Sequence, residues 1–452
     1  MDLLSDAVAR ARRYLESLPE RRVSPAAEAV AGLDALDRPL PERGADPAAV
    51  LAELDRVGSP ATVASAGGRY FGFVTGGSLP AALAATVMAA AWDQNCALTV
   101  MSPIAARTEA IALRWLIDVL GLPEGTAAGF VTGATTANFT ALAAARHALL
   151  ERQGWDVESR GLFGAPPLTV VVGDEVHVSL LKALSLLGLG RDRVVRVPTD
   201  GQGRMRAELL PPLDARTILC IQAGNVNTGA FDPAADLCAA ARARDAWVHV
   251  DGAFGLWAAA TPRLAGLVSS FAAADSWAVD AHKWLNVPYD SGLAFCRDRA
   301  ALRAAMSAAA AAYIVESDTR EPSHFVPEMS RRARGVEIWA ALASLGRSGL
   351  ADLIDRSCAH ARHFAAGLSA GGHEVLNEVV LNQVLVAFGD DETTRRIIAA
   401  VQAEGTCWCG GTVWHGRAAM RISVSAWATT ERDVERSLAA ILEVARRERS
   451  PR

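Results

Sequence analysis

The chain has 452 residues, of which 51% are hydrophobic and 21% are charged, with 45 basic against 50 acidic side chains. This composition is typical of folded globular proteins and excludes a disordered chain, and the mixed charges exclude a basic nucleic-acid-binding surface. Only two of the basic residues are lysine, Lys182 and Lys283. Because an arginine cannot serve as a Schiff-base amine, each lysine is a candidate for chemistry.

The N-terminal 25 residues are expected to form an amphipathic helix. Leu4, Val8, Leu15 and Leu18 recur at helical spacing among charged residues, a pattern that favours a helix over a signal peptide. The longest apolar stretch, Ala81–Trp92, is too short to span a bilayer. The seven cysteines are scattered along the chain. Cys407 and Cys409 form one close pair, but the second pair of ligands that a zinc site needs is missing. The sequence therefore predicts a cytoplasmic protein with no membrane segment and no metal site.

The middle of the chain alternates short β-branched runs with helical stretches, which predicts a largely parallel sheet covered by helices. The expected strands are 168–172, 217–222, 247–250, 277–279 and 292–296. Long helices follow over 334–345 and 350–368, then a strand over 420–427 and a last helix over 430–447, where Thr430 and Asp433 resemble a capping box. The predicted fold is α/β, with a helical segment over 1–62, a large α/β domain over 63–333 and a small α+β domain over 334–452.

Polar residues follow the carboxyl ends of these expected strands, where parallel α/β sheets collect reactive groups. In chain order they are His177, Asn225, Asp251 and the pair His282-Lys283. A turn of small residues, Thr132–Asn138, leads into a helix over 139–150 and offers backbone N–H groups that suit a phosphate. These groups are expected to meet at one edge of the sheet.

Each of these residues also has an ordinary structural explanation. The turn could be only a helix N-cap, Asp251 could cap the next segment, and His177 and His249 could be core histidines. Taken together, a phosphate turn, a strand-end Asp and a His-Lys pair form one chemical set. That set matches pyridoxal phosphate, which needs an amine for its aldehyde, a carboxylate against its pyridine nitrogen and anion-binding backbone for its phosphate.

From about Tyr70 to about Ile441 the sequence resembles the group II pyridoxal-phosphate-dependent amino-acid decarboxylases, which share the aspartate-aminotransferase fold, known as fold type I. The motifs that carry the resemblance are Glu175-Val176-His177, Asp280-Ala281-His282-Lys283-Trp284 and Ser330-Arg331-Arg332. The resemblance implies an L-amino-acid decarboxylase that uses pyridoxal 5'-phosphate, with an aldimine at Lys283 and a quinonoid intermediate. It also implies a homodimer with shared active sites that acts on a small amino-acid substrate.

The resemblance assigns roles to individual residues. For the cofactor, Lys283 would form the aldimine, Asp251 would pair with the pyridine nitrogen, His177 and Ala253 would lie on opposite ring faces, and Ala134, Thr135 and His282 would hold the phosphate. For catalysis, Tyr313 would return a proton to the substrate carbon with His177 nearby, and Arg421, Tyr70 and Phe73 would contact the substrate. On the residues alone, Tyr313 could instead be a surface residue at a helix end, and Arg421 an ordinary edge-strand residue.

Three departures from the family pattern concern the cofactor pocket. Gly224-Asn225-Val226 replaces Gly-Thr-Thr, so a hydroxyl near the ring is missing, and Asn225 could supply a polar group instead. Asp280 stands where some relatives have Asn, and a carboxylate there would repel phosphate unless it orients His282. The phosphate turn reads Gly133-Ala134-Thr135-Thr136 rather than Gly-Gly-Ser/Thr-Glu. The substrate side chain is therefore left open.

Other functions stay open on the sequence alone. The same cofactor supports decarboxylation-dependent oxidative deamination, which makes an aldehyde, and also transamination. A non-catalytic nucleotide-binding protein is a weaker alternative, because Gly188-Leu189-Gly190 and Gly201-Gln202-Gly203 are incomplete fingerprints. A metal hydrolase built from His177, His249, Asp251 and His282 lacks ligand spacing on one element. Lys182, on the helix expected over 178–187, is expected to have a structural or supporting role.

Overall fold

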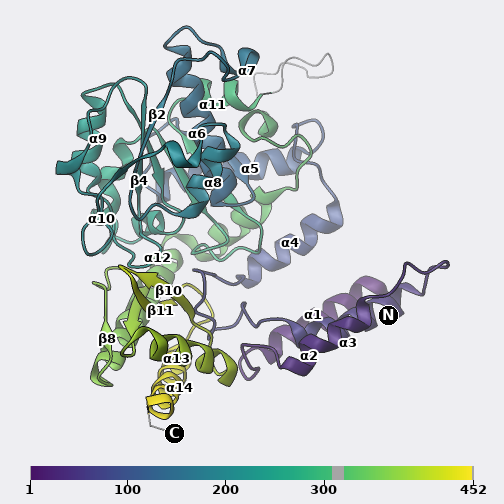
Figure 1. The fold of residues 1–452 in the computed structure, drawn as a ribbon. Coiled ribbons are helices and arrows are strands. Elements are labelled where there is room, and N and C mark those ends of the chain that lie inside the picture. The colour runs from purple at the N-terminus through teal and green to yellow at the C-terminus, as the bar shows by residue number, and fades with distance from the viewer. Residues whose placement is uncertain (1, 308–319, 450–452) are drawn as a thin grey trace. The chain divides into compact units, whose positions relative to one another are not determined.

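The computed structural model describes residues 2–307 and 320–449 (Figure 1). The chain divides into two compact units. The first unit comprises Met1–Gly77, His360–Leu376 and Val384–Arg452, and the second comprises Ser78–Ala359 and Asn377–Gln383. The domain boundaries predicted after residues 62 and 333 remain predictions.

The second unit is built on a seven-stranded sheet with the order β1-β7-β6-β5-β4-β2-β3. Its strands are β1 (Ala127–Val131), β2 (Thr169–Gly173), β3 (Val195–Val197), β4 (Thr217–Gln222), β5 (Trp247–Asp251), β6 (Ser276–Asp280) and β7 (Gly292–Cys296). The five strands from β6 to β3 pair in parallel, and β7 runs antiparallel to both of its neighbours. The predicted α/β class is confirmed, and each predicted strand of this sheet lies within one residue of an observed one.

Two strands of the large sheet were not predicted. β1 reads Ala-Ala-Gly-Phe-Val and β3 has only three residues, so neither carries a clear β-branched run. The central strands β4, β5, β6 and β7 are buried at every position. Burial on both faces is what helices packed on a sheet produce, and it explains why these strands read as continuous apolar runs.

The helices of the second unit are α4 (Pro80–Trp92), α5 (Pro103–Val119), α6 (Ala134–Glu151), α7 (Val157–Arg160), α8 (Val178–Leu186), α9 (Ala234–Arg242), α10 (Ala265–Val268), α11 (Arg299–Met306) and the first part of α12 (Arg334–Ala370). Residues of α6 and α8 pack with β2, β4 and β5 in one buried apolar cluster. Helix α6 begins five residues before the predicted start, at Ala134, so the small-residue turn is itself the first turn of the helix. In α12, Gly346 has a non-helical backbone with φ of +60°, and this separates the two helices expected over 334–345 and 350–368.

The first unit contains five α-helices among the described residues, α1 (Leu3–Ser17), α2 (Ala27–Ala31), α3 (Pro47–Ala61), α13 (Asp391–Glu404) and α14 (Glu431–Arg449), besides the end of α12 and a 3-10 helix over Gly32–Leu36. Its sheet has the order β10-β11-β9-β8, with β8 (Glu374–Val375), β9 (Gln383–Ala387), β10 (Gly410–Trp414) and β11 (Arg417–Ser423). The predicted N-terminal helix is confirmed, and Asp2 caps it by accepting the Ser5 N–H at 2.9 Å. The capping box is confirmed as well, because Thr430 and Asp433 each accept the other's backbone N–H.

The strand predicted over 420–427 is displaced. β11 spans Arg417–Ser423, because His415 and Gly416 adopt positive φ and close a tight hairpin that pairs Trp414 with Arg417. Residues 424–427 leave the sheet before α14 begins. The alternation of apolar and polar residues was read correctly as a strand, but the turn that sets its start was not recognised.

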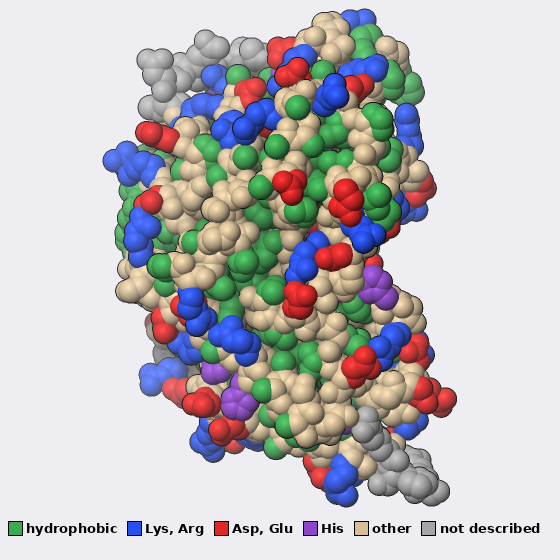
Figure 2. All heavy atoms as spheres, turned by 90° about the vertical axis from the view of Figure 1, so that its left-hand side faces the viewer, with side chains coloured by type: hydrophobic (Ala, Val, Ile, Leu, Met, Phe, Trp, Pro, Cys, Tyr) green, Lys and Arg blue, Asp and Glu red, His purple; other side chains and the backbone are tan. Residues whose placement is uncertain are grey.

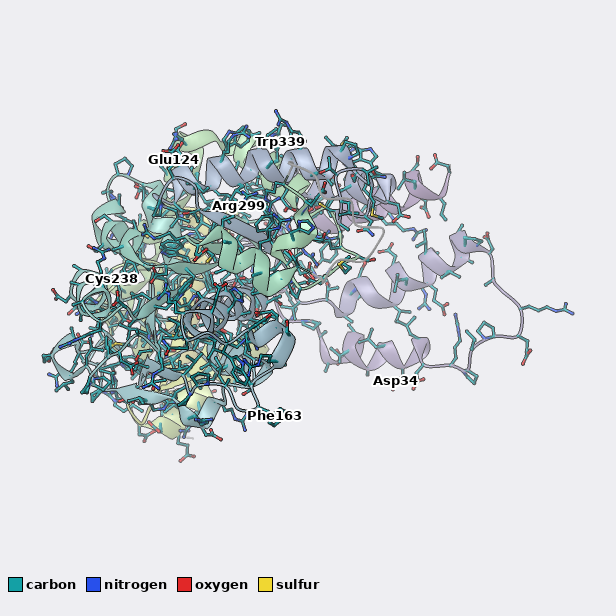
Figure 3. The ribbon with its side chains drawn as sticks, turned by 90° about the horizontal axis from the view of Figure 1, so that it is seen from above. Asp34, Glu124, Phe163, Cys238, Arg299 and Trp339 are labelled. Atoms are coloured by element: carbon teal, nitrogen blue, oxygen red, sulfur yellow. The ribbon has the colours of Figure 1, made fainter. Side chains whose placement is uncertain are left out.

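The surface bears out the charge mixing seen in the sequence. On the face shown in Figure 2, basic and acidic side chains are interspersed rather than gathered by sign. Isolated apolar side chains also reach solvent, such as Phe163, which is 98% exposed at the edge of the view in Figure 3. Within residues 2–307 and 320–449, no helix combines the length and the apolar character needed to cross a bilayer.

Candidate active site

Two neighbouring parallel strands bring the predicted chemistry to one edge of the large sheet. Asp251 ends β5 and Asp280 ends β6, and these strands pair in parallel. The Asp280 N–H donates to the Ala253 carbonyl at 2.8 Å, which ties the two strand ends together beyond the sheet. The segments Asp251–Ala253 and Asp280–Lys283 therefore lie side by side, as the sequence predicted.

A buried chain of hydrogen bonds ends on the Asp251 carboxylate. The Asn138 amide Nδ2 donates to Asp251 Oδ2 at 3.3 Å, and the Asn138 Oδ1 lies 2.8 Å from His249 Nε2. On the other side of the imidazole, Nδ1 lies 2.9 Å from the Ser276 hydroxyl, which accepts the Trp247 indole N–H at 2.9 Å. Each of these contacts is buried inside the second unit.

The direction of every bond in this chain follows from its two ends. A carboxylate can only accept, so Asn138 turns its NH₂ group to Asp251 and its oxygen to His249. His249 then carries its proton on Nε2, and Nδ1 accepts from Ser276. Burial lowers the pKa of His249 to about 3, which agrees with a neutral ring. His249 is thus a structural histidine that orients Asn138, and through it Asp251.

The Asp280 carboxylate contacts both the phosphate turn and Lys283. Asp280 Oδ1 accepts the Ala134 N–H at 2.5 Å, and Oδ2 lies 2.9 Å from Lys283 Nζ. His282 Nε2 lies 3.6 Å from Oδ1. The predicted phosphate turn and the predicted Schiff-base lysine are therefore joined by a residue that the sequence singled out only as a departure.

Lys283 is held as a cation by its surroundings. Burial opposes the charged form of the amine, but attraction to Asp280, the hydrogen bond that the amine donates to that carboxylate, and weaker attraction to Asp251 raise the pKa of Lys283 above its ordinary value overall. The side chain is only 16% exposed. A proton must leave this amine before it can act as a nucleophile.

The His282 ring is held by residues of the loop that follows Lys283. The Ser291 N–H donates to His282 Nδ1 at 3.2 Å, and the Tyr289 ring packs against the imidazole with centroids 4.3 Å apart. Tyr289 is also near enough to contribute to the raised pKa of Lys283. The sequence did not single out Tyr289, although it is one of only four tyrosines and lies six residues after Lys283.

His177 and Asn225 lie on turns at the same edge. His177 follows β2 and caps α8 by accepting the Ser179 N–H at 3.3 Å. Two residues earlier, the backbone carbonyl of Glu175 accepts the side-chain amide N–H of Gln222, at the end of β4, at 3.0 Å. Asn225 Oδ1 accepts the N–H groups of Asn227 and Thr228, which shapes the loop after β4.

The residues gathered here fit pyridoxal phosphate. A Cβ on Gly133 would lie 3.0 Å from the His282 ring, so glycine lets the turn at the start of α6 lie close against that ring without crowding it. The Ala134 N–H at this helix start already donates to an anionic group, the Asp280 carboxylate. The amide Nδ2 of Asn225 is buried and has no hydrogen-bond partner within the described residues. An anion-binding turn, an amine, a carboxylate and a free amide donor match the groups of the cofactor.

The residues proposed for a metal hydrolase do not assemble into a metal site. Within the described parts of the chain, no group of three or more His, Cys, Asp and Glu side chains could hold an ion. His249 is committed to Ser276 and Asn138, and His282 to Ser291. The geometry therefore favours the cofactor over the metal.

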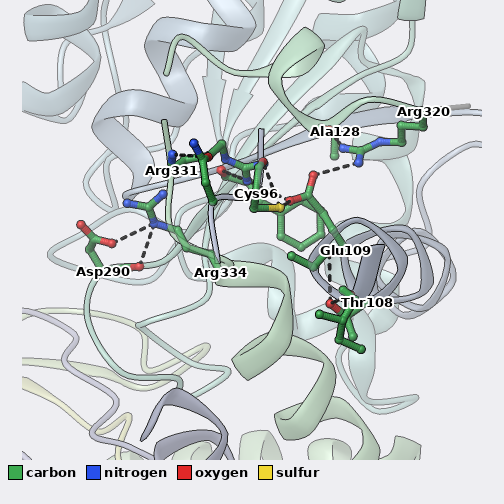
Figure 4. Close-up of polar contacts among 12 residues, drawn as sticks. Cys96, Thr108, Glu109, Ala128, Asp290, Arg320, Arg331 and Arg334 are labelled. Carbon is green, nitrogen blue, oxygen red and sulfur yellow. Dashed lines mark hydrogen bonds and ion pairs between the residues drawn. The ribbon is translucent and has the colours of Figure 1, made fainter. Parts of the chain in front are cut away.

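A buried ion-pair network lies at residues 320 and 331 (Figure 4). Glu109 is fully buried and accepts from Arg320 Nη1 and Arg331 Nη2, both at 2.8 Å. The two guanidinium groups also donate to the carbonyls of Ala128 and Phe130 in β1. Burial alone would raise the pKa of Glu109, but the two arginines lower it overall. The Arg320 guanidinium is thereby held by Glu109 and by the Ala128 carbonyl.

Replacing Glu109 with glutamine should destabilise the protein by about 3–5 kcal/mol, because Arg320 and Arg331 would keep buried charges without a counter-charge. Urea unfolding measures this loss. The matched control is Asp118→Asn, which breaks an exposed pair with Arg347 and should cost less than about 1 kcal/mol. Equal effects of the two variants would show that the buried network carries no special stability.

Four predicted residues are not placed in this site. Arg421 lies on β11 of the first unit, where burial lowers its pKa. Tyr70 and Phe73 belong to the same unit, and their rings lie 5.1 and 5.4 Å from that of Trp408. Tyr313 lies outside the described residues. Their proposed contacts with substrate and cofactor therefore remain predictions.

Sequence reasoning missed the residues that support the predicted ones. Asn138 lies in the turn Thr132–Asn138, whose sequence indicates only a helix start, and Ser276 belongs to no recognisable motif. The residues that the sequence did not predict act on a neighbouring side chain across the sheet rather than on the cofactor. Only the pairing of β5 with β6 and the path of α6 place them together.

The chain matches the family model described as the pyridoxal-dependent decarboxylase conserved domain over residues 34–389. It is 30% identical to an L-2,4-diaminobutyrate decarboxylase of Rhizobium meliloti (strain 1021), with 92% of this chain and 85% of the relative aligned. It is 27% identical to an aromatic-L-amino-acid decarboxylase of Bacillus atrophaeus, over 71% of this chain and 67% of the relative. An Arabidopsis thaliana phenylacetaldehyde synthase is also 27% identical, over 76% of this chain and 75% of its own length.

Solved structures share the fold. The TDC of Oryza sativa, solved with PLP and tryptamine, superposes with a TM-score of 0.89 at 22% identity, covering 98% of this chain and 97% of that one. Mouse CSAD superposes with a TM-score of 0.88 at 21% identity, covering 98% of each chain. The sheet and the site together therefore define the class of protein, which is a fold type I protein with a pyridoxal phosphate site. The chain belongs to the pyridoxal-dependent decarboxylase family, group II, whose cofactor is pyridoxal 5'-phosphate.

Proposed function

We propose that this enzyme decarboxylates an L-amino acid to the amine and carbon dioxide, with Lys283 as the amine that bonds covalently to the cofactor. The observation that carries the proposal is the hydrogen-bond chain that ends on Asp251, one strand away from the segment that holds Lys283. This chain of hydrogen bonds holds the Asp251 carboxylate in one orientation, as is needed for a carboxylate that pairs with a positively charged group. The pyridine nitrogen of the cofactor is that group.

When bound, the cofactor accepts the electrons released as the bond to the substrate carboxylate breaks. Asp251 keeps the pyridine nitrogen protonated, and Asn138 holds that carboxylate in place. The turn at Ala134 and Thr135, with His282, binds the phosphate. His177 and Ala253 would face opposite sides of the ring, and the buried Nδ2 of Asn225, which has no partner within the described residues, would donate to the ring's polar substituents.

Tyr313 returns a proton to the substrate carbon, with His177 nearby, and Arg421, Tyr70 and Phe73 contact the substrate. These roles rest on the family resemblance. A phenol is a suitable acid for this step because its proton can be passed on and replaced from water.

We further propose a cytoplasmic homodimer with active sites shared between subunits. On α1, Leu4 and Val8 lie four residues apart and are 58% and 48% exposed, so one side of this helix offers an apolar stripe that a partner can cover. A second copy of the chain is the occupant that the family resemblance implies.

The proposed reaction is tested by incubating the purified enzyme and pyridoxal phosphate with a panel of L-amino acids. The panel should include diaminobutyrate, the aromatic amino acids and the acidic amino acids, and both carbon dioxide and amine should be measured. Equal amounts of carbon dioxide and amine from at least one substrate are expected. Formation of a keto acid without carbon dioxide would replace the proposal with a transaminase.

Oxidative deamination is the second candidate, because a phenylacetaldehyde synthase is among the relatives. It differs in the fate of the substrate carbon after carbon dioxide has left. Instead of being protonated, this carbon is oxidised by dioxygen, which is reduced to hydrogen peroxide, and water then releases ammonia and leaves the aldehyde. Replacing Tyr313 with phenylalanine should therefore lower amine formation by about 10²-fold and raise the share of aldehyde. Amine and aldehyde are quantified from the same reaction.

Two further variants sharpen this prediction. Tyr289→Phe removes the phenol that packs against His282, and Tyr14→Phe removes one on α1, whose hydroxyl lies 2.9 Å from that of Thr62. Both should keep the amine as the main product. A switch to aldehyde in Tyr289→Phe, with Tyr313→Phe unchanged, would move the proton donor to Tyr289.

A further inference from the structure

Asp280 is bonded to two groups that the cofactor needs for its own binding. Its Oδ1 accepts the Ala134 N–H at 2.5 Å, and its Oδ2 pairs with Lys283 Nζ at 2.9 Å. The first is a backbone donor at the start of α6, where a phosphate would bind. The second is the amine that reacts with the aldehyde. One carboxylate therefore engages both anchoring points of the cofactor at once.

Neither contact can coexist unchanged with the bound cofactor. The Ala134 N–H has one proton to donate, so carboxylate and phosphate compete for it. Lys283 must lose a proton to form its covalent bond, whereas Asp280 raises the pKa of this amine against the effect of burial. A carboxylate left in place would also face a phosphate with the same sign of charge in a buried site.

The packing around Asp280 makes this engagement specific. The side chain is buried, and the helix turn approaches it closely, since a Cβ on Gly133 would lie 3.3 Å from Asp280 Oδ1. Gly292 supports the turn from behind, because a Cβ there would lie 2.5 Å from the Gly133 Cα. The backbone of Asp280 is also fixed, with its N–H on the Ala253 carbonyl and its carbonyl accepting the Trp257 indole N–H at 3.0 Å.

We propose that Asp280 is a built-in competitor for pyridoxal phosphate, which holds the phosphate turn and Lys283 until the cofactor displaces its carboxylate. In the structure Asp280 Oδ1 lies 3.6 Å from His282 Nε2, so a carboxylate that releases the Ala134 N–H has this ring as a neighbouring partner and can orient it toward the phosphate. Asp280 thus sets how tightly this enzyme retains its cofactor. The inference rests on the assignment of the cofactor site.

The test compares the full-length wild type with Asp280→Asn by titrating each cofactor-free protein with pyridoxal phosphate and following the visible absorbance of the bound form. Asparagine can still accept the Ala134 N–H but has no charge to hold Lys283 or to repel phosphate. The variant should bind pyridoxal phosphate about tenfold more tightly. Equal or weaker binding by a folded variant would overturn the proposal.

Two probes separate the two contacts. Inorganic phosphate lacks an aldehyde, and pyridoxal lacks a phosphate group. Each should raise the melting temperature of Asp280→Asn at a concentration several-fold lower than it needs with the wild type, whereas a gain limited to pyridoxal would contradict competition at the turn. If Asp280→Asn does not fold, Asp280→Ser serves in the same assays.

The control is Asp245→Asn, an exposed residue with φ of +54°, a conformation that asparagine tolerates. This variant should bind all three probes like the wild type. A wild type and an Asp280→Asn variant that both ignore pyridoxal phosphate would contradict the cofactor site itself. Two proteins that bind it equally would contradict only the role of Asp280.

Discussion

Replacing Lys283 with arginine should abolish decarboxylation and the visible absorbance of the cofactor. Arginine keeps a positive charge beside Asp280, so the ion pair seen at 2.9 Å has a substitute and the fold is expected to survive. A guanidinium cannot lose its proton or bond to an aldehyde under these conditions. Because the covalent step depends on this amine, kcat should fall by at least about 10³-fold. Steady-state rates and the absorbance spectrum measure the two effects.

The chain supplies its own matched control for this experiment. Lys182 is the other of its two lysines, and it lies exposed on α8. Lys182→Arg should leave both rate and spectrum unchanged. A Lys182→Arg variant that loses the absorbance, beside a Lys283→Arg variant that keeps it, would reverse the assignment of the two lysines.

Replacing Asp251 with asparagine should have the second largest effect. The fold allows the change, because asparagine can still accept the Ala253 N–H that Asp251 accepts at 3.2 Å. It cannot supply the negative charge that keeps the pyridine nitrogen protonated, so the ring becomes a poorer electron acceptor. Loss of such a fixed electrostatic contribution is expected to lower kcat by about 10²–10³-fold. Lys283 is untouched, so the cofactor should remain covalently bound.

The supporting residues behind Asp251 provide a graded comparison. Asn138→Ala removes the amide that donates to the carboxylate at 3.3 Å but leaves the charge, so its effect on kcat should be smaller than that of Asp251→Asn. Restoring an amide with Asn138→Gln is not expected to restore the rate, because the longer side chain does not fit between His249 and Asp251, which are both buried. An Asp251→Asn enzyme with a rate within about threefold of the wild type would remove Asp251 from the mechanism.

The parts of the fold that could be predicted are those with a local signal. β4 and β7 were predicted to the residue because each is a continuous apolar run bounded by turn residues. The separation of α12 into two helices at Gly346 and the capping box at Thr430 also have local signals, since each depends on residues that are close together in the sequence. β1 was missed because its alanines and glycine are compatible with several local structures, and only its pairing with β7 makes it a strand.

The candidate site shows the same division between local and long-range information. Lys283 and Asp251 could be recognised from their motifs and from their positions after strands. Asp280 was noticed as an unusual carboxylate, but its contact with Ala134 joins residues 146 positions apart and depends on how α6 meets β6. Glu109 and Arg331, 222 positions apart, form a buried pair for the same reason. No local pattern marks such partners.

The central claim is that Lys283 bonds to pyridoxal phosphate at the edge formed by β5 and β6. The most direct measurement is reduction of the pyridoxal-phosphate-loaded wild type with borohydride, followed by proteolysis and mass spectrometry of the modified peptide. We predict that the cofactor is found on the peptide that contains Lys283 and on no other. A protein that stays colourless with added pyridoxal phosphate, or one that carries the reduced cofactor on Lys182, would contradict the claim.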